Sequence, residues 1–272
     1  MAVRTALNMV AFSYTPNASG SPGAVNALGL LKTFAASAAN DQRDAGGLAT
    51  RTPVFLNVKQ GQTVDFTVFV PNTVSGAAEP VLSNLDISVY SEAGTSYLGQ
   101  LRSGSIDVVT LTKEASGIAS AYKSPSATRT QIQVSTRKLV ISNAVDMPLM
   151  LNGTSAAMDL AVVFTVGTVS FECPMTLKSA RHLVDREELQ FEDVVLTPKG
   201  SATGPSDNSL LGNILLGTSQ VALAIDTGAG QYSTGSGMWA LITRLTTKFE
   251  DGNLIEQNGQ LQFQGPAVWS AG

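Results

Sequence analysis

The residues with the clearest potential for chemistry are Cys173 and His182, the single cysteine and the single histidine of the chain. A thiol and an imidazole can act as a nucleophile and its base when the fold brings them within hydrogen-bond reach. A catalytic triad or a histidine-based zinc site needs more partners than this chain offers. We therefore expect Cys173 to be a small buried side chain and His182 to belong to an exposed charged segment.

Acidic and glycine-rich motifs also fall short of a catalytic site. Asp226-Thr227-Gly228 matches half of the aspartic-protease pattern, which requires two aspartates that share a proton, and no second copy is present. The glycine-rich segment 228–237 lacks the spacing and the lysine of a phosphate-binding loop. We expect a solvated face or a contact between subunits for three carboxylates in a mixed-charge run: Asp185, Glu187 and Glu188. The sequence therefore predicts no enzyme, no cofactor and no metal site.

The composition argues against a nucleic-acid or membrane partner. Charged residues make up 14% of the 272 residues, against about 25% in a typical domain, and the net charge is −4. An electrostatic grip on nucleic acid needs a clustered basic footprint, and no segment supplies one. No run approaches the roughly 18 apolar residues of a membrane helix, and the first residues lack the features of a signal peptide.

The hydrophobic pattern predicts an all-β, mainly antiparallel sandwich or barrel with one or two short helices. From residue 53 onward, apolar residues alternate with polar ones, as in the stretch through Val64, Phe66 and Val68. Helical spacing of apolar residues predicts one short helix at about 24–39, or a loop that becomes ordered only against a neighbour. The charged segment 178–193 is expected to form a second short helix or a loop.

The domain organisation follows from the same change of pattern. Residues 1–52, rich in Ala, Gly, Ser and Asn, are expected to form an N-terminal arm, and residues 53–272 the β-domain. A weak internal echo links 106–117 with 192–204, which share Asp-Val-Val followed by Leu-Thr and Lys. A duplication would divide the β-domain into two related halves, about 53–150 and 151–272.

The segment "KFEDGNLIEQNGQLQFQG" at 248–265 holds two turn signals, Asp251-Gly252 and Asn258-Gly259. Two turns would leave a five-residue strand between them, which is short. We favour one long hairpin that turns at Asp251-Gly252 and carries a bulge at Asn258-Gly259. A polar row of Gln257, Gln260, Gln262 and Gln264 is expected to face water or a neighbour, with Leu261 and Phe263 packed inward.

The C-terminal third, "GMWALITRLTTKFEDGNLIEQNGQLQFQGPAVW", resembles the closing hairpin of bacteriophage major tail tube proteins. In that family a β-sandwich ends in two long strands, and the second alternates to a Phe-x-Gly; Ile242 to Phe249 and Leu261 to Gly265 match these strands here. The resemblance covers about 50 residues and implies rings stacked into a hollow tube. It places the assembly interface at Trp239, Phe249, Asp251, Gly252, Ile255, Asn258, Gly259, Leu261, Phe263 and Trp269.

The function expected from these features is that of a non-enzymatic virion structural protein, assembled in the host cytoplasm. Its partners would be further copies of itself and other virion proteins, with nucleic acid only as passing or enclosed cargo. Two alternatives stay open. One is a viral major capsid protein with a jelly-roll fold, and the other is a β-sandwich module that binds carbohydrate or a receptor. The low aromatic content of 6% argues against a carbohydrate site.

Overall fold

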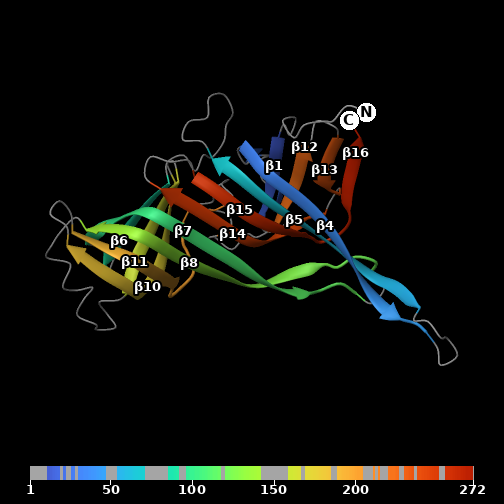
Figure 1. Ribbon diagram of the computed structural model, residues 1–272, viewed down its shortest axis with the longest axis horizontal. Coiled ribbons are helices and arrows are strands. Elements are labelled where there is room, and N and C mark those ends of the chain that lie inside the picture. Colours follow the sequence, from blue (N-terminus) through green and yellow to red (C-terminus); the bar gives the residue numbers. More distant parts are fainter. Residues whose placement is uncertain are drawn as a thin grey trace.

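A computed structural model gives the three-dimensional structure of the chain (Figure 1). Everything below concerns the residues that this structure describes. These are 11–18, 21–22, 26–27, 30–46, 54–70, 85–91, 96–117, 120–141, 159–166, 169–184, 189–204, 211, 214, 220–226, 230–235, 238–250 and 255–271.

The fold is all-β, as the alternating pattern predicts. Apart from Leu211 and Ile214, no described residue has helical backbone, and every ladder between strands is antiparallel. The strands are Ala11–Ala18 (β1), Ser21–Pro22 (β2), Asn26–Ala27 (β3), Leu30–Asp44 (β4), Phe55–Val70 (β5), Leu85–Ser91 (β6), Tyr97–Glu114 (β7), Pro125–Ile141 (β8), Asp159–Val166 (β9), Val169–Val184 (β10), Leu189–Pro198 (β11), Gln220–Asp226 (β12), Gly230–Thr234 (β13), Ala240–Glu250 (β14), Ile255–Phe263 (β15) and Ala267–Ala271 (β16).

Six strands close into a barrel in the order β6-β7-β8-β11-β10-β9. Because β9 returns to lie beside β6, the strands β6, β7, β8 and β9 form a Greek key with the spatial order β9-β6-β7-β8. Cross-strand neighbours on the inner face fill the barrel with large apolar side chains, which leave no room for a channel within the subunit. These include Ile87, Leu101, Leu139, Phe164, Phe171 and Phe191, all buried.

The remaining strands form a β-sandwich. One layer has the order β4-β5-β15-β14, and the other has the order β16-β13-β12-β1. Tyr232 of the second layer packs against Phe34 and Phe263 of the first, with ring centroids 5.9 and 5.6 Å apart. These aromatic contacts join the two layers face to face.

Barrel and sandwich share one continuous sheet and one core. Residues 244–250 of β14 pair with residues 103–109 of β7, so that an unbroken antiparallel run extends β8-β7-β14-β15-β5-β4 (Figure 1). One inward-facing row crosses all six strands of this run. It consists of Ile132, Val108, Leu245, Gly259, Phe66 and Phe34.

The helix predicted at 24–39 is wrong, because residues 26–27 and 30–44 are strands. β4 pairs with β5 from Leu30 opposite Phe69 to Asp44 opposite Phe55. The strong two-residue period of β5 offers a complete hydrogen-bonding partner, and this outweighs the weak local preference of an Ala- and Ser-rich segment.

The charged segment 178–193 is neither a helix nor simply a loop. Residues up to Val184 belong to β10 and those from Leu189 belong to β11. The two arms pair with each other, as in Arg181 opposite Glu192, and Arg181 forms ion pairs with both Glu192 and Asp193. Lys178, Arg181 and Asp193 are exposed, whereas Leu177, Phe191 and Val194 of the same two strands are buried in the barrel.

Residues 248–265 form one hairpin, as favoured from the sequence, but the bulge is not at Asn258-Gly259. β15 pairs with β5 without interruption. The register shift lies in β14, between Ile242 and Arg244, where Thr243 is the extra residue. Asp251 and Gly252, the predicted turn, lie outside the described residues.

Gly259 serves a close approach rather than a turn. It lies between Leu245 of β14 and Phe66 of β5. A Cβ atom added at this position would overlap the ring of Phe66. The Phe66 ring therefore occupies the space in the core that a side chain at position 259 would need.

Gln257 faces the core and not water, because it shares its face with Ile255, Gly259 and Leu261. Its Nε2 donates to Thr247 Oγ1 at 3.2 Å. Its Oε1 is buried and has no hydrogen-bond partner among the described residues. A buried amide oxygen without a hydrogen-bond partner lowers the free energy of unfolding, so Gln257 Oε1 is an unfavourable polar atom within the apolar core.

Strands of the predicted N-terminal arm join both layers of the sandwich, since β1 pairs with β12 and β4 with β5. Strands of the two proposed halves are interleaved: β6 pairs with β9, β8 with β11 and β7 with β14. The boundary at residue 52 and the duplication stay predictions.

Replacing Gly259 by Ala is expected to lower the free energy of unfolding by about 1–3 kcal/mol, the usual effect of overpacking. Adding Phe66→Leu should recover part of this loss, because the clash is with a side chain. At Gly104 the added Cβ would meet the backbone of Ser135 and Thr136, so Gly104→Ala should have no such rescue. Gly117→Ala is the control, since no atom lies within 4 Å of the added Cβ. Urea unfolding of the four variants measures these differences. A Gly259→Ala variant with the free energy of unfolding of the wild type would contradict the argument.

Thr247→Val should destabilise the fold by about 1–3 kcal/mol, because it leaves the Gln257 amide without its partner. The double variant Thr247→Val/Gln257→Leu should be more stable than Thr247→Val alone, since it removes both unpaired atoms. Denaturant unfolding of the three proteins gives the comparison. Equal stability of the single and double variants would show that an unpaired Gln257 amide does not lower the free energy of unfolding.

Candidate assembly surface

Five of the predicted interface residues lie inside the subunit. β15 is enclosed between β14 and β5, and the inward face of this hairpin is buried against the core. Asn258 is half-buried on the opposite face and accepts a hydrogen bond from Thr67 Oγ1 at 2.7 Å. These side chains stabilise the subunit itself, and their role between subunits stays a prediction. The five are Phe249, Ile255, Gly259, Leu261 and Phe263.

The two tryptophans have different surroundings. Trp239 is half-buried where β14 begins, and its backbone carbonyl accepts a hydrogen bond from the backbone N–H of Gln264 at 2.9 Å. Trp269 lies on β16 with 54% of its surface exposed. Of the described residues predicted for the interface, Trp269 is therefore the one that lies open to solvent.

The outer face of the continuous sheet is polar. Gln260 and Asn258 lie on this face, opposite the buried side of β15. Gln260 Nε2 donates to Asp65 Oδ1 at 2.9 Å, and Thr246 Oγ1 donates to Asp107 Oδ1 at 2.7 Å. A shallow hollow of about 490 Å³ on this face has both charge signs on its lining, which includes Arg244, Lys248 and Asp65. The mixed charges suit a hydrated surface better than a site for an anion or a cation.

The structure separates Cys173 from His182. Both residues belong to β10, and nine residues of extended strand span about 30 Å. Cys173 is fully buried in the barrel, and this burial raises the pKa of its thiol to about 11. The neutral buried thiol and its distance from the histidine leave no basis for a nucleophile–base pair.

The Asp226-Thr227-Gly228 motif falls between two paired strands. Asp226 ends β12 and Gly230 begins β13, with Asp226 opposite Gln231. Thr227 and Gly228 lie outside the described residues. Outside them too are the three carboxylates at 185, 187 and 188.

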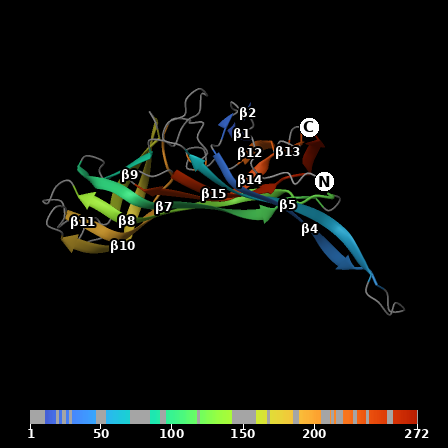
Figure 2. The ribbon, with the colours of Figure 1, turned by 45° about the horizontal axis from the view of Figure 1, so that its top comes forward.

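The far end of the β4–β5 hairpin projects away from the other strands (Figures 1 and 2). All side chains of 35–46 and 54–57 are exposed. The apolar residues Val54, Phe55 and Leu56, called here the hairpin tip, are among them; Phe55 and Leu56 are each 57% exposed. Three consecutive apolar residues at the start of a strand place apolar groups on both of its faces, and this run is a signal that the sequence itself carries.

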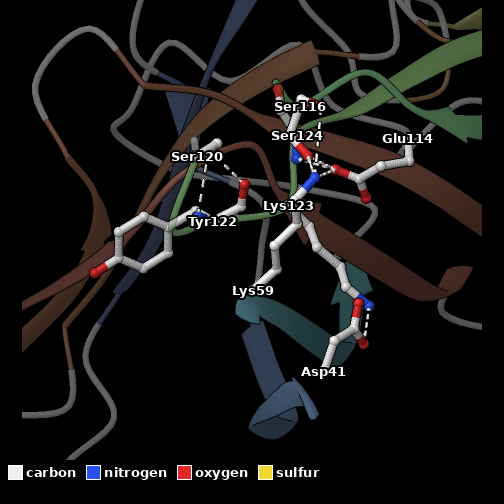
Figure 3. A network of polar contacts seen from close by, with 8 residues as sticks. All are labelled: Asp41, Lys59, Glu114, Ser116, Ser120, Tyr122, Lys123 and Ser124. Carbon is white, nitrogen blue, oxygen red and sulfur yellow. Dashed lines mark hydrogen bonds and ion pairs between the residues drawn. The ribbon is translucent and has the colours of Figure 1, made fainter. Parts of the chain in front are cut away.

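A polar network braces the hairpin where it leaves the body of the subunit (Figure 3). Lys59 Nζ donates to Ser116 Oγ at 2.6 Å and lies 3.8 Å from the Glu114 carboxylate. Lys123 forms an ion pair with Asp41 at 2.7 Å. Backbone hydrogen bonds of Gln60 with Ala121 and Lys123, each 2.9 Å, anchor the same region to the end of the β7–β8 hairpin.

The projecting part of the hairpin begins just beyond this brace. The ladder of β4 and β5 shifts register between Asp41 and Gln42, which leaves Val58 as an extra residue in β5. Bulges bend strands and increase their twist. The hairpin is thus held at Asp41 and Lys59 and redirected outward immediately after them.

A second set of exposed apolar side chains lies at β16. Met238, Val268 and Trp269, called here the β16 patch, are each more than two-fifths exposed. Met238 and Val268 both lie near Gly235, and the Trp269 ring lies against Gly230. A side chain at Gly230 would collide with Trp269 and with the backbone of Ser270.

The buried thiol predicts that Cys173 is inert in the native protein. At pH 8 an aromatic disulfide reagent should label no thiol in the folded chain and one thiol after urea unfolding. The variant Leu111→Cys is a matched control, because its exposed thiol should react at once in the native state. Between pH 9 and 11 the thiol ionises in the unfolded chain but not in the folded one, so stability should fall as the pH rises through this interval. Rapid native labelling of Cys173 would contradict its burial.

No helix among the described residues is long and apolar enough to cross a membrane. In the same part of the chain, no group of three or more His, Cys, Asp and Glu side chains is placed to hold a metal ion.

No protein-family model matches the chain, and no curated protein matches it. The hairpin tip and the β16 patch hold six of the eight large apolar side chains that are exposed among the described residues, and this makes them the candidate site.

Proposed function

We propose that this protein is a self-assembling structural subunit of a virion, and that its most specific form is a ring subunit of a phage tail tube. The observation that carries the proposal is the projecting β4–β5 hairpin, with its exposed apolar tip. A two-stranded ribbon is marginally stable in water by itself. Exposed apolar side chains at its end add a further cost that contact with another subunit would remove.

The uncovered edge of β4 supports the same proposal. Among the described residues, β4 pairs with β5 alone, so its outer edge is unpaired over fifteen residues. Monomeric proteins protect such edges with charges, prolines or bulges. Between the bulge at Lys32 and the charged end at 41–44, residues 33–40 carry no charge, no proline and no bulge. An edge of this kind fits a subunit whose neighbours cover it.

The polar outer face of the sheet is compatible with nucleic acid as passing cargo. Its charges are mixed, and two of its cations are paired: Lys32 and Lys248 each lie within 4 Å of Glu256. A face of this kind, lining a channel, would stay hydrated without holding the phosphate backbone.

A closed shell is the alternative form of assembly. A jelly roll has eight strands in two Greek keys. The barrel described here has six strands and is joined edge to edge to a sandwich. The exposed hairpin supports contact between subunits in either case, and the shape of the assembly distinguishes the two.

Shortening the hairpin tests the proposal. Replacing residues 42–58 by Asn-Gly would join Asp41 to Lys59, which are opposite each other, through a two-residue turn. The shortened chain should keep the thermal stability of the wild type within a few degrees and lose assembly, measured by light scattering and negative-stain microscopy. Wild-type rings stacked around a channel support the tube, and closed shells support the capsid. A wild type that stays monomeric at high concentration, or a shortened chain that assembles normally, would refute the proposal.

A further inference from the structure

We infer that the hairpin tip of one copy binds the β16 patch of the next, so that subunits associate head to tail. This inference rests on the proposed function and adds which two surfaces meet. A contact between two different surfaces of the same chain is heterologous and generates a ring or a helical filament.

The hairpin tip exposes apolar side chains on both faces of the two-stranded ribbon. In the ladder, Leu56 lies opposite Arg43 and Phe55 lies opposite Asp44. Leu56 and Val54 therefore point to one face of the ribbon, and Phe55 points to the other. No side chain of the described subunit covers either face, because the whole stretch 54–57 is exposed.

The β16 patch has exposed apolar side chains on both faces of β16, and in the described part of the chain the outer edge of this strand is occupied at Ala267 alone, whose amide donates to Gln62 Oε1 at 2.6 Å. β16 pairs only with β13 among the described residues. Trp269 lies opposite Tyr232, whose ring reaches the core at Phe263, so the patch continues the core outward to the surface. Residues 267–271 carry no charge. Beyond Ala267 a neighbouring strand can pair with this edge and place one apolar side chain against Val268 on one face and another against Trp269 on the other.

A second copy is the partner that accounts for both surfaces at once. Six of the eight large apolar side chains that are exposed among the described residues belong to the tip or to the β16 patch. The tip extends away from β16 in both views, so one subunit does not cover its own patch (Figures 1 and 2). A single repeated contact between copies covers both sets, and no like charges oppose it, because the patch is uncharged.

Complementation between two defective variants tests the inference. Phe55→Ser/Leu56→Ser removes the tip and keeps the patch, whereas Val268→Ser/Trp269→Ala removes the patch and keeps the tip. Each variant alone should be monomeric, with self-association weakened at least about tenfold relative to wild type. An equal mixture should form a one-to-one dimer that does not grow, since one tip and one patch remain. Leu111→Ser, which removes an exposed apolar group outside both surfaces, is the control and should assemble as the wild type does.

Sedimentation velocity measures these states, and circular dichroism checks that each variant is folded. A mixture that stays monomeric while the wild type assembles would overturn the inference and leave the proposed function intact. Either variant assembling alone like the wild type would have the same effect. A monomeric wild type would overturn both.

A second measurement keeps the test independent of the stability of these variants. Leu56→Cys mixed with Ser270→Cys should be linked by a short bis-maleimide reagent into a heterodimer. Leu111→Cys mixed with Ser270→Cys, and the wild type with its buried Cys173, should give only background. Equal linking in all three samples would contradict the contact.

Discussion

The structure depends on the pairing of β14 with its neighbours. β14 is hydrogen-bonded to β15 along one edge, and to β12 and then β7 along the other. Because β7 belongs to the barrel and β12 and β15 to the sandwich, this one strand holds both parts in a single sheet. Its inward side chains, such as Ile242 and Leu245, are fully buried and contribute to one shared core. The C-terminal hairpin is therefore the centre of the subunit.

Around this centre the subunit divides into a closed part and an open part. Barrel and sandwich bury their apolar faces within one chain. The β4–β5 hairpin instead leaves the core beyond the brace formed by Lys59, Glu114 and the Lys123–Asp41 pair. Beyond that point nothing in the described subunit covers it. Its order in a larger assembly would come from contacts that a neighbour supplies, which is why the proposed function rests on this element.

The low charge of the chain has a structural counterpart on the outer face of the sheet. Threonine, asparagine and glutamine side chains form hydrogen bonds across neighbouring strands, as between Thr67 and Asn258. Cross-strand pairs of this kind stabilise a sheet without charged groups. Two of the charged residues on this face have such partners: Glu256 lies within 4 Å of Lys248, and Asp65 accepts from the Gln260 amide. A large surface can in this way stay hydrated while offering no concentrated charge.

The sequence by itself determined the fold class, the single long hairpin at 248–265 and the burial of Cys173, because two-residue alternation and turn residues are local signals. It did not determine that residues 30–44 are a strand, since β5 supplies their partner only in three dimensions. The same holds for Gly259. The Asn258-Gly259 dipeptide is typical of a turn, but glycine is needed here because the Phe66 ring on the neighbouring strand leaves no room for a side chain. Only the tertiary structure decided which strands are interior and which are edges. That choice buried β15 and left Val54, Phe55 and Leu56 exposed, because burial depends on neighbours distant in sequence.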